Sequence, residues 1–589
     1  MSDPVSLARE LLSEDPDPET RAELEALLKR AASGEEAARR DLADRFSGPL
    51  EFGTAGLRGK VEAGLARINR LAVIKASWGL GSHLLADESA DARTRGVVVG
   101  FDGRHSSRRF AEDTAAVLAG LGVPVRLFPD PVPTPLLAFS VPRLQAAGGV
   151  MVTASHNPPW DNGYKVYIAT GGQIVPPVDR KVAARIAAAP RADAIPRPAP
   201  ADAARGGLRQ LVDARDTAVE EAYLDGLAGA SLHRGASGPL RIAYTPMHGV
   251  GHRLAIRAFT RAGFEGVAVE PVQADPDGAF RTVSFPNPEE PGAMDRVLAL
   301  AAETEAELVL ANDPDADRLA AAVPDRSGQG YRMLSGNEIG VLLADDALEH
   351  AETGGRPKLV VTTVVSSSLL SRMARDRGAR YLETLTGFKW IADAALRAER
   401  EGAAYVLGYE EALGYSVGPL VRDKDGIGAA LRMAELTRHL KARGETLLGR
   451  IDQLLVRHGL SHQLQWSVTL PGAEGRARID AAMAALRKSP PPRIGSSPIV
   501  RTLDGLSGEE SLRGERRPSG LPSSDLVAFQ SQDGSRLTAR PSGTEPKIKF
   551  YLELVGQAKD PAAVAATRAG LDAECLKLKA ALLKELKLA

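Results

Sequence analysis

Short apolar runs rich in β-branched residues alternate with helical patterns along most of the chain. The candidate strands lie at 97–99, 149–152, 308–310, 359–361 and 405–407. Helical patterns lie between them, at 108–121, 254–262, 293–302, 337–348 and 366–375. Short apolar strands that alternate with helices are typical of α/β units with largely buried sheets. The pattern therefore predicts an α/β fold for most of the chain.

The two ends of the chain depart from this alternation. Residues 7–46 are amphipathic and acidic and predict two or three short helices, the first two separated by Pro16 and Pro18. At the other end, strands at 461–470, 537–539 and 548–554 mix with helices at 475–487 and 560–585, which is typical of an α+β domain. Two stretches with little periodicity, 187–206 and 488–524, are interpreted as linkers or exposed loops.

Composition narrows the class of protein. At 589 residues the chain is long enough for three to five domains, at about 100–200 residues each. With a net charge of -1 the chain has no excess of basic residues that would attract a nucleic acid, so we expect no nucleic-acid partner. The single cysteine, Cys575, excludes an internal disulfide and is expected to be a small buried apolar residue. No apolar leader or membrane-spanning stretch is evident, so we expect a cytoplasmic monomer or weak dimer without a membrane partner.

Three of the predicted strands lead directly into polar segments. Ser155 and His156 follow the strand at 149–152, and an aspartate-rich segment follows the strand at 308–310. Glu410 and Glu411 follow the strand at 405–407. Ligands of α/β sheets bind at the carboxyl ends of strands, so each segment is in the right place for a site. On its own, Ser155 also fits an ordinary polar turn, because a serine hydroxyl is a poor nucleophile without activation.

The aspartate-rich segment predicts a metal site. Asp313, Asp315 and Asp317 alternate, and in an extended loop their side chains would point to the same side. Three such carboxylates repel one another unless a cation lies between them, and a hard divalent ion prefers oxygen ligands. A calcium EF-hand is excluded because its sixth and twelfth positions hold Arg318 and Pro324. The alternative is a solvated acidic loop.

Other segments carry weaker signals for phosphate binding and proton transfer. The turn at 540–546 offers a guanidinium, hydroxyls and a flexible glycine, which can hold a phosphate, although such turns are often plain surface turns. The glycine-rich segment 52–60 is not a Walker A motif, because Val61 follows Lys60. Lys165 and Lys389 are candidate proton handlers only if burial or nearby positive charge lowers the pKa.

Taken together and in order, five of these segments resemble the α-D-phosphohexomutase family. They are Phe-Gly-Thr-Ala-Gly-Leu-Arg-Gly (52–59), Thr-Ala-Ser-His-Asn-Pro (153–158), Asp-Pro-Asp-Ala-Asp-Arg (313–318), Gly-Tyr-Glu-Glu-Ala-Leu-Gly (408–414) and Arg-Pro-Ser-Gly-Thr-Glu-Pro (540–546). Two further segments, 246–251 and 423–426, are similar to the phosphoglucomutase-2-like branch. That branch includes phosphoglucomutases, phosphopentomutases and a glucose-1,6-bisphosphate synthase.

The resemblance implies four domains around a central cleft. Three of them would be α/β domains with mixed sheets, and the fourth a C-terminal α+β domain. On this sequence we place the boundaries at 1–210, 211–332, 333–458 and 459–589, with the helical extension in the first domain. Each domain would supply one loop: the phosphoserine loop, the metal loop, the sugar loop and the phosphate loop in turn.

The resemblance also implies roles for individual residues. Ser155 would be the phosphoserine and, with Asp313, Asp315 and Asp317, would hold Mg²⁺. Charge stabilisation or proton transfer would fall to four residues: Arg58, His156, Lys165 and Lys389. Substrate would be bound by Thr54, Arg318, Thr386, Gly387, Glu410, Glu411, Lys424, Arg540, Ser542, Gly543 and Thr544.

The implied activity is that of a phosphosugar mutase. We expect interconversion of glucose 1-phosphate and glucose 6-phosphate through the phosphoserine, with glucose 1,6-bisphosphate as intermediate and activator. Ala412 stands where hexose-specific phosphoglucomutases usually carry serine, which leaves mannose and pentose phosphates and bisphosphate synthesis as alternatives. Outside this class, the alternatives are a non-catalytic sugar-phosphate sensor and a metal-dependent phosphatase.

Overall fold

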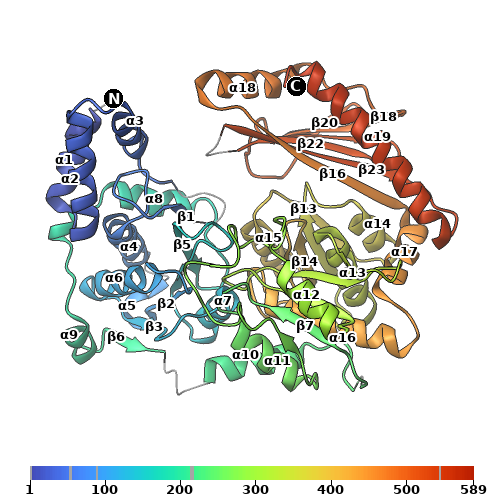
Figure 1. Ribbon diagram of the computed structural model, residues 1–589, viewed down its shortest axis with the longest axis horizontal. Helices are drawn as coiled ribbons and strands as arrows, with labels where there is room; N and C mark the ends of the chain where they lie inside the picture. The colour runs from blue at the N-terminus through green and yellow to red at the C-terminus, as the bar shows by residue number, and fades with distance from the viewer. Residues whose placement is uncertain are drawn as a thin grey trace. The chain divides into compact units, whose positions relative to one another are not determined.

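The computed structural model describes residues 3–51, 56–87, 90–212, 218–235, 237–542 and 546–588 (Figure 1). The chain forms two compact units, a first unit of residues 1–334 with 413–438 and a second unit of residues 335–412 with 439–589. Among the described helices, none combines the length and the apolar character needed to span a membrane. The finer division into four domains with boundaries at 210, 332 and 458 stays a prediction.

The predicted N-terminal helices are present in the first unit. They are α1 (Pro4–Glu14), α2 (Pro18–Ala32) and α3 (Glu36–Arg45). Asp3 and Asp17 cap the first two helices by accepting hydrogen bonds from backbone N–H groups, and a proline occupies the first turn of each. Their apolar faces share a core with Ala192 and Ile195, so the predicted linker at 187–206 is partly ordered rather than a free loop.

A mixed sheet follows in the first unit, in the strand order β1-β5-β4-β2-β3-β6. Its strands are β1 (Leu57–Lys60), β2 (Val97–Phe101), β3 (Val125–Leu127), β4 (Gly148–Val152), β5 (Asp161–Ile168) and β6 (Arg209–Leu211). Its helices are α4 (Arg70–Ala86), α5 (Ala92–Arg95), α6 (Ser107–Gly120), α7 (Thr134–Arg143), α8 (Val178–Ala187) and α9 (Pro200–Arg205). β2 lies parallel to β4, and β5 returns antiparallel beside β4. The loop between β4 and β5 carries Ser155.

A second mixed sheet of the first unit has the order β11-β10-β9-β7-β8. Its strands are β7 (Ile242–Thr245), β8 (Ala268–Val269), β9 (Leu308–Ala311), β10 (Ala320–Pro324) and β11 (Tyr331–Met333). Its helices are α10 (Ala218–Gly229), α11 (His252–Arg261) and α12 (Asp295–Glu303). β9 is fully buried, as its apolar sequence predicts, and runs into the aspartate-rich segment. The later segment 413–438 adds β15 (Gly414–Ser416), where Gly414 pairs with Arg318, and most of α16 (Gly426–Ala442).

The second unit contains a parallel sheet with the strand order β13-β12-β14. Its strands are β12 (Lys358–Thr363), β13 (Arg380–Thr384) and β14 (Ala404–Glu410). Its helices are α13 (Gly336–His350), α14 (Leu369–Asp376), α15 (Phe388–Arg400) and α17 (Leu447–His458). Ser335 and Glu338 form a capping box that starts α13. β14 extends three residues beyond the predicted 405–407, so Glu410 is the last residue of a strand rather than part of a loop.

The C-terminal part of the second unit is an antiparallel sheet with the order β16-β23-β22-β21-β18-β19-β20, and β17 pairs with β18. Its strands are β16 (Leu460–Thr469), β17 (Arg493–Ile494), β18 (Ser497–Asp504), β19 (Glu509–Leu512), β20 (Glu515–Pro518), β21 (Val527–Ser531), β22 (Arg536–Pro541) and β23 (Lys547–Gly556). α18 (Gly472–Lys488) and α19 (Val564–Glu585) accompany it, and Trp466 stacks on Phe550 in the core. Cys575 is buried, as expected.

The interpretation of 488–524 as a polar linker was wrong. Four strands, β17 to β20, lie in this stretch. β20 is exposed at every position, and in β19 only the polar Glu510 is buried. Strands near the edge of an antiparallel sheet bury little surface, so they lack the apolar run on which the prediction of strands depended.

Candidate active site

Ser155 lies in a tight loop that connects β4 to β5. Its backbone has a φ of 52°, in the left-handed region that non-glycine residues rarely adopt. The Ser155 N–H donates to Thr153 Oγ1 at 2.8 Å, which helps hold this conformation. Only 3% of Ser155 is exposed. A serine kept buried in an unfavourable backbone conformation indicates a functional constraint on its position.

The three aspartates converge through a turn after β9, not through the extended loop that the sequence suggested. The Ala316 N–H donates to the Asp313 carbonyl at 2.8 Å, and Ala316 has a φ of 55°. This turn brings carboxylate oxygens of Asp313, Asp315 and Asp317 within 4.8 Å of one another. All three residues are 0% exposed, so the alternative of a solvated acidic loop is excluded.

The serine and the aspartates meet directly. Ser155 Oγ donates to Asp313 Oδ2 at 2.8 Å, across 158 positions of sequence. His156 Nδ1 lies 3.2 Å from the same hydroxyl. The structure therefore brings together two segments that the sequence placed independently at strand ends.

Two lysines neutralise the aspartates. Lys165 Nζ, from β5, lies 2.8 Å from Asp315 Oδ2 and 2.9 Å from Asp317 Oδ2. Lys424 Nζ lies 3.0 Å from Asp317 Oδ2. Burial acts to lower the pKa of Lys165, but the two carboxylates outweigh it and raise the pKa above its ordinary value. Lys165 thus lies as a counter-ion to Asp315 and Asp317 in this structure, and its part in proton transfer stays a prediction.

The pKa of Asp313 is shifted in the opposite direction from those of Asp315 and Asp317. Burial, followed by the charges of Asp315 and Asp317, raises the pKa of Asp313 well above its ordinary value. Burial acts in the same direction on the other two, but the nearby cationic lysines hold the pKa of Asp315 and of Asp317 below the ordinary value. A buried, partly neutralised cluster of this kind is typical of a functional site.

The donor set of the cluster fits a hard divalent cation. Asp315 Oδ1 and Asp317 Oδ1 are buried and have no hydrogen-bond partner among the described residues. Buried acceptors without a donor are costly, and a cation between them would remove that cost. Carboxylate oxygens are the ligands that Mg²⁺ takes in proteins. These aspartates form a group that is able to hold a metal ion.

Positive side chains border the serine and the aspartates. Arg58 Nη1, on β1, donates to Asn157 Oδ1 at 2.8 Å. Burial, followed by the nearby charges of Arg318 and Arg58, lowers the pKa of His156 well below its ordinary value. The Arg318 N–H donates to Asp313 Oδ1 at 2.9 Å. All of the predicted catalytic and metal residues of the first unit thus lie in one neighbourhood.

The second unit holds a separate group of predicted residues. Glu410 Oε1 accepts a hydrogen bond from the Gly387 N–H at 2.6 Å, and Glu411 accepts one from Ser366 Oγ at 3.0 Å. Thr386 Oγ1 is buried without a hydrogen-bond partner in the part of the chain that the structure describes. Lys389 is half-buried, with its ammonium 5.4 Å from the centre of the Trp390 ring.

The predicted phosphate loop is described only in part. Arg540 lies near the end of β22, opposite Lys549, so the strand continues into the segment that we expected to be a turn. Arg540 Nε is buried without a hydrogen-bond partner among the described residues, and the Ser542 N–H donates to the Lys547 carbonyl at 2.7 Å. Thr54, Gly543 and Thr544 lie outside the described residues.

Sequence reasoning missed several residues that contact the site. Thr134 Oγ1 donates to Asp315 Oδ2 at 2.6 Å, and Asp102 and Arg104 contact the Ser155 loop. Asp102 and Arg104 directly follow β2, so the rule that identified the other loops would have found them. Thr134 stands between two prolines as the first residue of α7, and no pattern in the sequence signals its contact.

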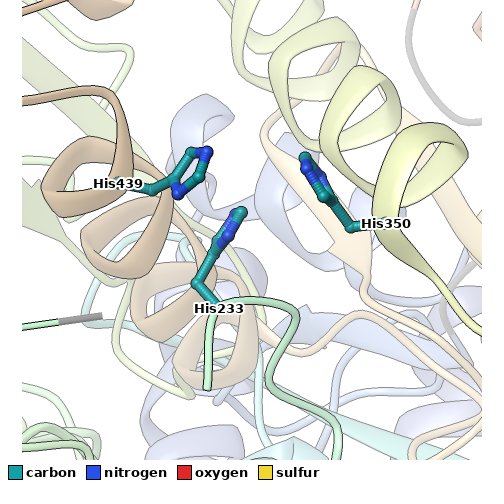
Figure 2. A group of neighbouring side chains, drawn as sticks. All are labelled: His233, His350 and His439. Atoms are coloured by element: carbon teal, nitrogen blue, oxygen red, sulfur yellow. The ribbon is translucent and has the colours of Figure 1, made fainter. Parts of the chain in front are cut away.

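A pair of histidines in the second unit was also not predicted. His350 from α13 and His439 from α16 pack edge to face, with their ring centres 5.6 Å apart (Figure 2). His350 Nδ1 lies 3.1 Å from Asp346 Oδ1, one turn earlier on α13. His233, also labelled in Figure 2, belongs to the first unit.

Four domain models of one family match the chain in order. They are described as phosphoglucomutase/phosphomannomutase α/β/α domains I, II and III and the C-terminal domain, and they match residues 49–192, 221–328, 335–454 and 477–570. The helices α1, α2 and α3 lie before the first match.

Individual relatives agree with these models. A probable phosphomannomutase of Haemophilus influenzae is 39% identical over 84% of this chain and 94% of its own length. A probable phosphoribomutase of Schizosaccharomyces pombe is 38% identical over 85% of this chain and 86% of its own length. The crystal structure of a putative phosphomannomutase from Thermus thermophilus is similar with a TM-score of 0.64 and 25% identity, over 90% of this chain and 99% of that one. The chain therefore belongs to the phosphoglucomutase/phosphomannomutase family of α-D-phosphohexomutases, which are intramolecular phosphotransferases.

Proposed function

We propose that this protein is a phosphosugar mutase that moves a phosphoryl group through Ser155, and that it interconverts glucose 1-phosphate and glucose 6-phosphate. The observation that carries the proposal is the contact of Ser155 Oγ with Asp313, in a cluster of three buried aspartates. A serine that only capped a turn would need neither an acidic cluster nor a strained backbone. A serine that carries a phosphoryl group needs a cation beside it, and the cluster supplies the ligands for one.

In the proposed reaction the phosphorylated Ser155 gives its phosphoryl group to the free hydroxyl of a sugar monophosphate. The P–Oγ bond of the serine breaks, a P–O bond to the sugar forms, and the proton that the sugar hydroxyl loses is balanced by one that Ser155 Oγ takes up. The resulting bisphosphate then returns its other phosphoryl group to Ser155, and the isomeric monophosphate leaves. Phosphate is neither gained nor lost over the cycle, which separates a mutase from a phosphatase.

We assign different roles in the reaction to different residues of the first unit. Asp313, Asp315 and Asp317 would hold Mg²⁺, which offsets the negative charge of the phosphoryl group when it is bound. Lys165 and Lys424 keep the cluster from carrying three uncompensated charges. Arg58, Arg318 and His156 would face the transferring phosphoryl group. Catalysis of this kind depends mostly on positioning and on fixed charges.

In the second unit we propose that Glu410 and Glu411 bind sugar hydroxyls and that Arg540 and Ser542 bind the phosphate that does not react. The buried Thr386 Oγ1 and Arg540 Nε, without partners among the described residues, support this assignment, because ligand oxygens would satisfy them. Thr54, Gly543 and Thr544 are proposed to bind substrate and Lys389 to assist proton transfer, on the family resemblance alone.

The choice of sugar is the part of the proposal that needs a direct test. Relatives are named for mannose and ribose phosphates, and Ala412 lacks the hydroxyl of the hexose-specific enzymes. We propose measuring kcat/KM for glucose, mannose and ribose 1-phosphates, with glucose 1,6-bisphosphate as activator. The highest value for glucose 1-phosphate supports the proposal. Negligible glucose turnover beside rapid ribose turnover would assign a phosphopentomutase instead.

A further inference from the structure

We propose that Arg104 is a positioning residue for the phosphoryl carrier: it fixes the backbone of the Ser155 loop while Asp102 holds the loop from the other side. The inference rests on the proposed role of Ser155 and deepens it. Arg104 and Asp102 lie just after β2, the neighbour of β4 in the sheet. Neither is among the residues predicted from sequence.

The guanidinium group of Arg104 donates hydrogen bonds to four backbone carbonyl groups of the loop. Arg104 Nη2 donates to the carbonyls of Ser155 at 2.7 Å and Asn157 at 2.5 Å. Arg104 Nη1 donates to the carbonyls of Pro158 at 2.6 Å and Asp161 at 3.0 Å. These acceptors span the whole turn from the serine to the first residue of β5. The loop has two backbone hydrogen bonds of its own, from the Asn157 N–H to the Ala154 carbonyl at 3.0 Å and from the Asp161 N–H to the Pro158 carbonyl at 3.1 Å. The Arg104 side chain adds four more hydrogen bonds and connects both ends of the turn.

The other side of the loop is tied to Asp102. Asp102 Oδ2 accepts from Thr153 Oγ1 at 2.6 Å, and the Thr153 hydroxyl in turn accepts from the Ser155 N–H at 2.8 Å. Asp102 Oδ2 also lies 3.2 Å from Arg104 Nε. Asp102 thus fixes the N–H of Ser155 through the Thr153 hydroxyl, and Arg104 fixes the carbonyl of the same serine directly.

Burial makes this arrangement specific to arginine. Arg104 is 4% exposed and Asp102 is 1% exposed, and the guanidinium packs over the Phe280 ring at 5.0 Å. The N–H groups of the planar guanidinium lie on separate nitrogen atoms, so arginine can donate to several carbonyls at once. The three N–H groups of a lysine ammonium share one nitrogen atom and cannot span the same set of carbonyls. A lysine here would keep the charge but leave some loop carbonyls unsatisfied.

The loop geometry matters because Ser155 holds an unfavourable φ of 52° while its hydroxyl contacts Asp313. Phosphoryl transfer needs the attacking and leaving oxygens roughly in line, and a misplacement of about 1 Å costs about 100-fold in rate. Loss of the Arg104 contacts would let the loop relax toward an ordinary conformation and move Oγ away from the aspartates.

The test compares Arg104→Lys with a matched Arg70→Lys variant. Arg70 makes a bidentate, largely buried pair with Asp113 between α4 and α6, at 2.7 and 2.8 Å, and is not part of the proposed machinery. For each full-length protein, the rate of phosphoryl transfer from glucose 1,6-bisphosphate to Ser155 is measured in a single turnover by intact mass. Hydrogen–deuterium exchange of residues 153–161 is measured on the same samples.

We expect Arg104→Lys to slow phosphoryl transfer about 100-fold and to speed exchange in the loop, with Arg70→Lys close to the wild type in both. Unchanged transfer in Arg104→Lys overturns the inference, whether or not exchange rises, and so does an equal loss in Arg70→Lys. If the wild-type protein itself acquires no phosphate on Ser155, the proposed function fails instead, and the two failures are thereby distinguished.

A second pair of variants covers the case in which Arg104→Lys does not fold. Thr153→Val keeps the shape of the side chain but removes the hydroxyl that links Asp102 to the Ser155 N–H. Thr114→Val, which removes a buried hydroxyl in α6, is the matched control. We expect transfer to slow about tenfold in Thr153→Val, because the hydrogen bond that links Asp102 to the Ser155 N–H is lost, and to stay near the wild-type rate in Thr114→Val. Equal rates in both variants contradict the inference.

Discussion

Replacing Lys165 with methionine tests whether the buried aspartates depend on a counter-ion. Lys165 is 1% exposed and contacts Asp315 at 2.8 Å and Asp317 at 2.9 Å. Methionine keeps most of the volume but no charge. Asp317 would retain its ion pair with Lys424, whereas Asp315 would keep the hydrogen bond from the Thr134 hydroxyl and no ion pair among the described residues. Only the longer-range charges of Arg58 and Arg104 would then offset the buried charge of Asp315.

The expected cost follows from this geometry. Breaking a buried ion pair by removing one partner costs about 3–5 kcal/mol, because the remaining charge stays out of water. Lys75→Met is the matched control, since Lys75 contacts Glu14 at 2.7 Å with 28% of its side chain exposed. An ion pair with this much exposure contributes no more than about 1 kcal/mol to the free energy of unfolding. The two variants remove the same ammonium group and differ mainly in burial.

Calorimetry with and without millimolar magnesium, together with hydrogen–deuterium exchange in β4 and β9, measures the loss in the first unit. We expect Lys165→Met to be destabilised far more than Lys75→Met, and magnesium to recover more stability in Lys165→Met than in the wild type. A ligand that binds only the folded state stabilises it in proportion to its affinity, and a more negative cluster binds a cation more tightly. Equal losses in the two variants, or an equal effect of magnesium, would refute this reasoning.

Three further predictions concern single residues. Burial raises the pKa of Asp425 to about 6, so its contribution to stability is complete below the unfolded pKa near 3.8 and is lost as the pH rises through about 6. The stability of Asp425→Asn relative to the wild type should therefore rise by up to about 3 kcal/mol between about pH 4 and about pH 8 in denaturant titrations, and a constant difference would contradict this. Burial also raises the pKa of the Cys575 thiol to about 12, so a thiol-specific reagent at neutral pH should label it only after unfolding; rapid labelling of the native protein would show the burial to be wrong. Ala412→Ser should raise the preference for glucose 1-phosphate over ribose 1-phosphate in kcat/KM by roughly fivefold to tenfold, the value of one added hydrogen bond, and no change would remove position 412 from sugar selection.

The strands that lead into the site could be predicted from sequence because they are buried on both faces. Apolar runs such as 149–152 and 308–310 mark β4 and β9, and the polar residues after them mark the site. The predicted contact of Ser155 with the aspartates rested on family resemblance and on the rule for strand ends, and the structure confirms that the two segments meet.

Other features could not be predicted because they depend on local turns or on distant partners. The aspartates converge through a left-handed Ala316, a residue whose sequence gives no sign of that conformation. Whether Lys165 has a lowered or a raised pKa depends on which charges surround it, and these come from another sheet of the first unit. β20 is exposed at every position and the one buried residue of β19 is Glu510, so neither strand carries an apolar pattern.

The central claim is that Ser155 carries the phosphoryl group. The most direct test incubates the full-length protein with magnesium and glucose 1,6-bisphosphate, then measures intact mass and maps the modified peptide by mass spectrometry. The account predicts one added phosphoryl group, located on Ser155, absent from Ser155→Ala and removed when glucose 1-phosphate is added as acceptor. Undiminished mutase turnover by Ser155→Ala, or phosphate located on another residue of a fully active protein, would contradict it.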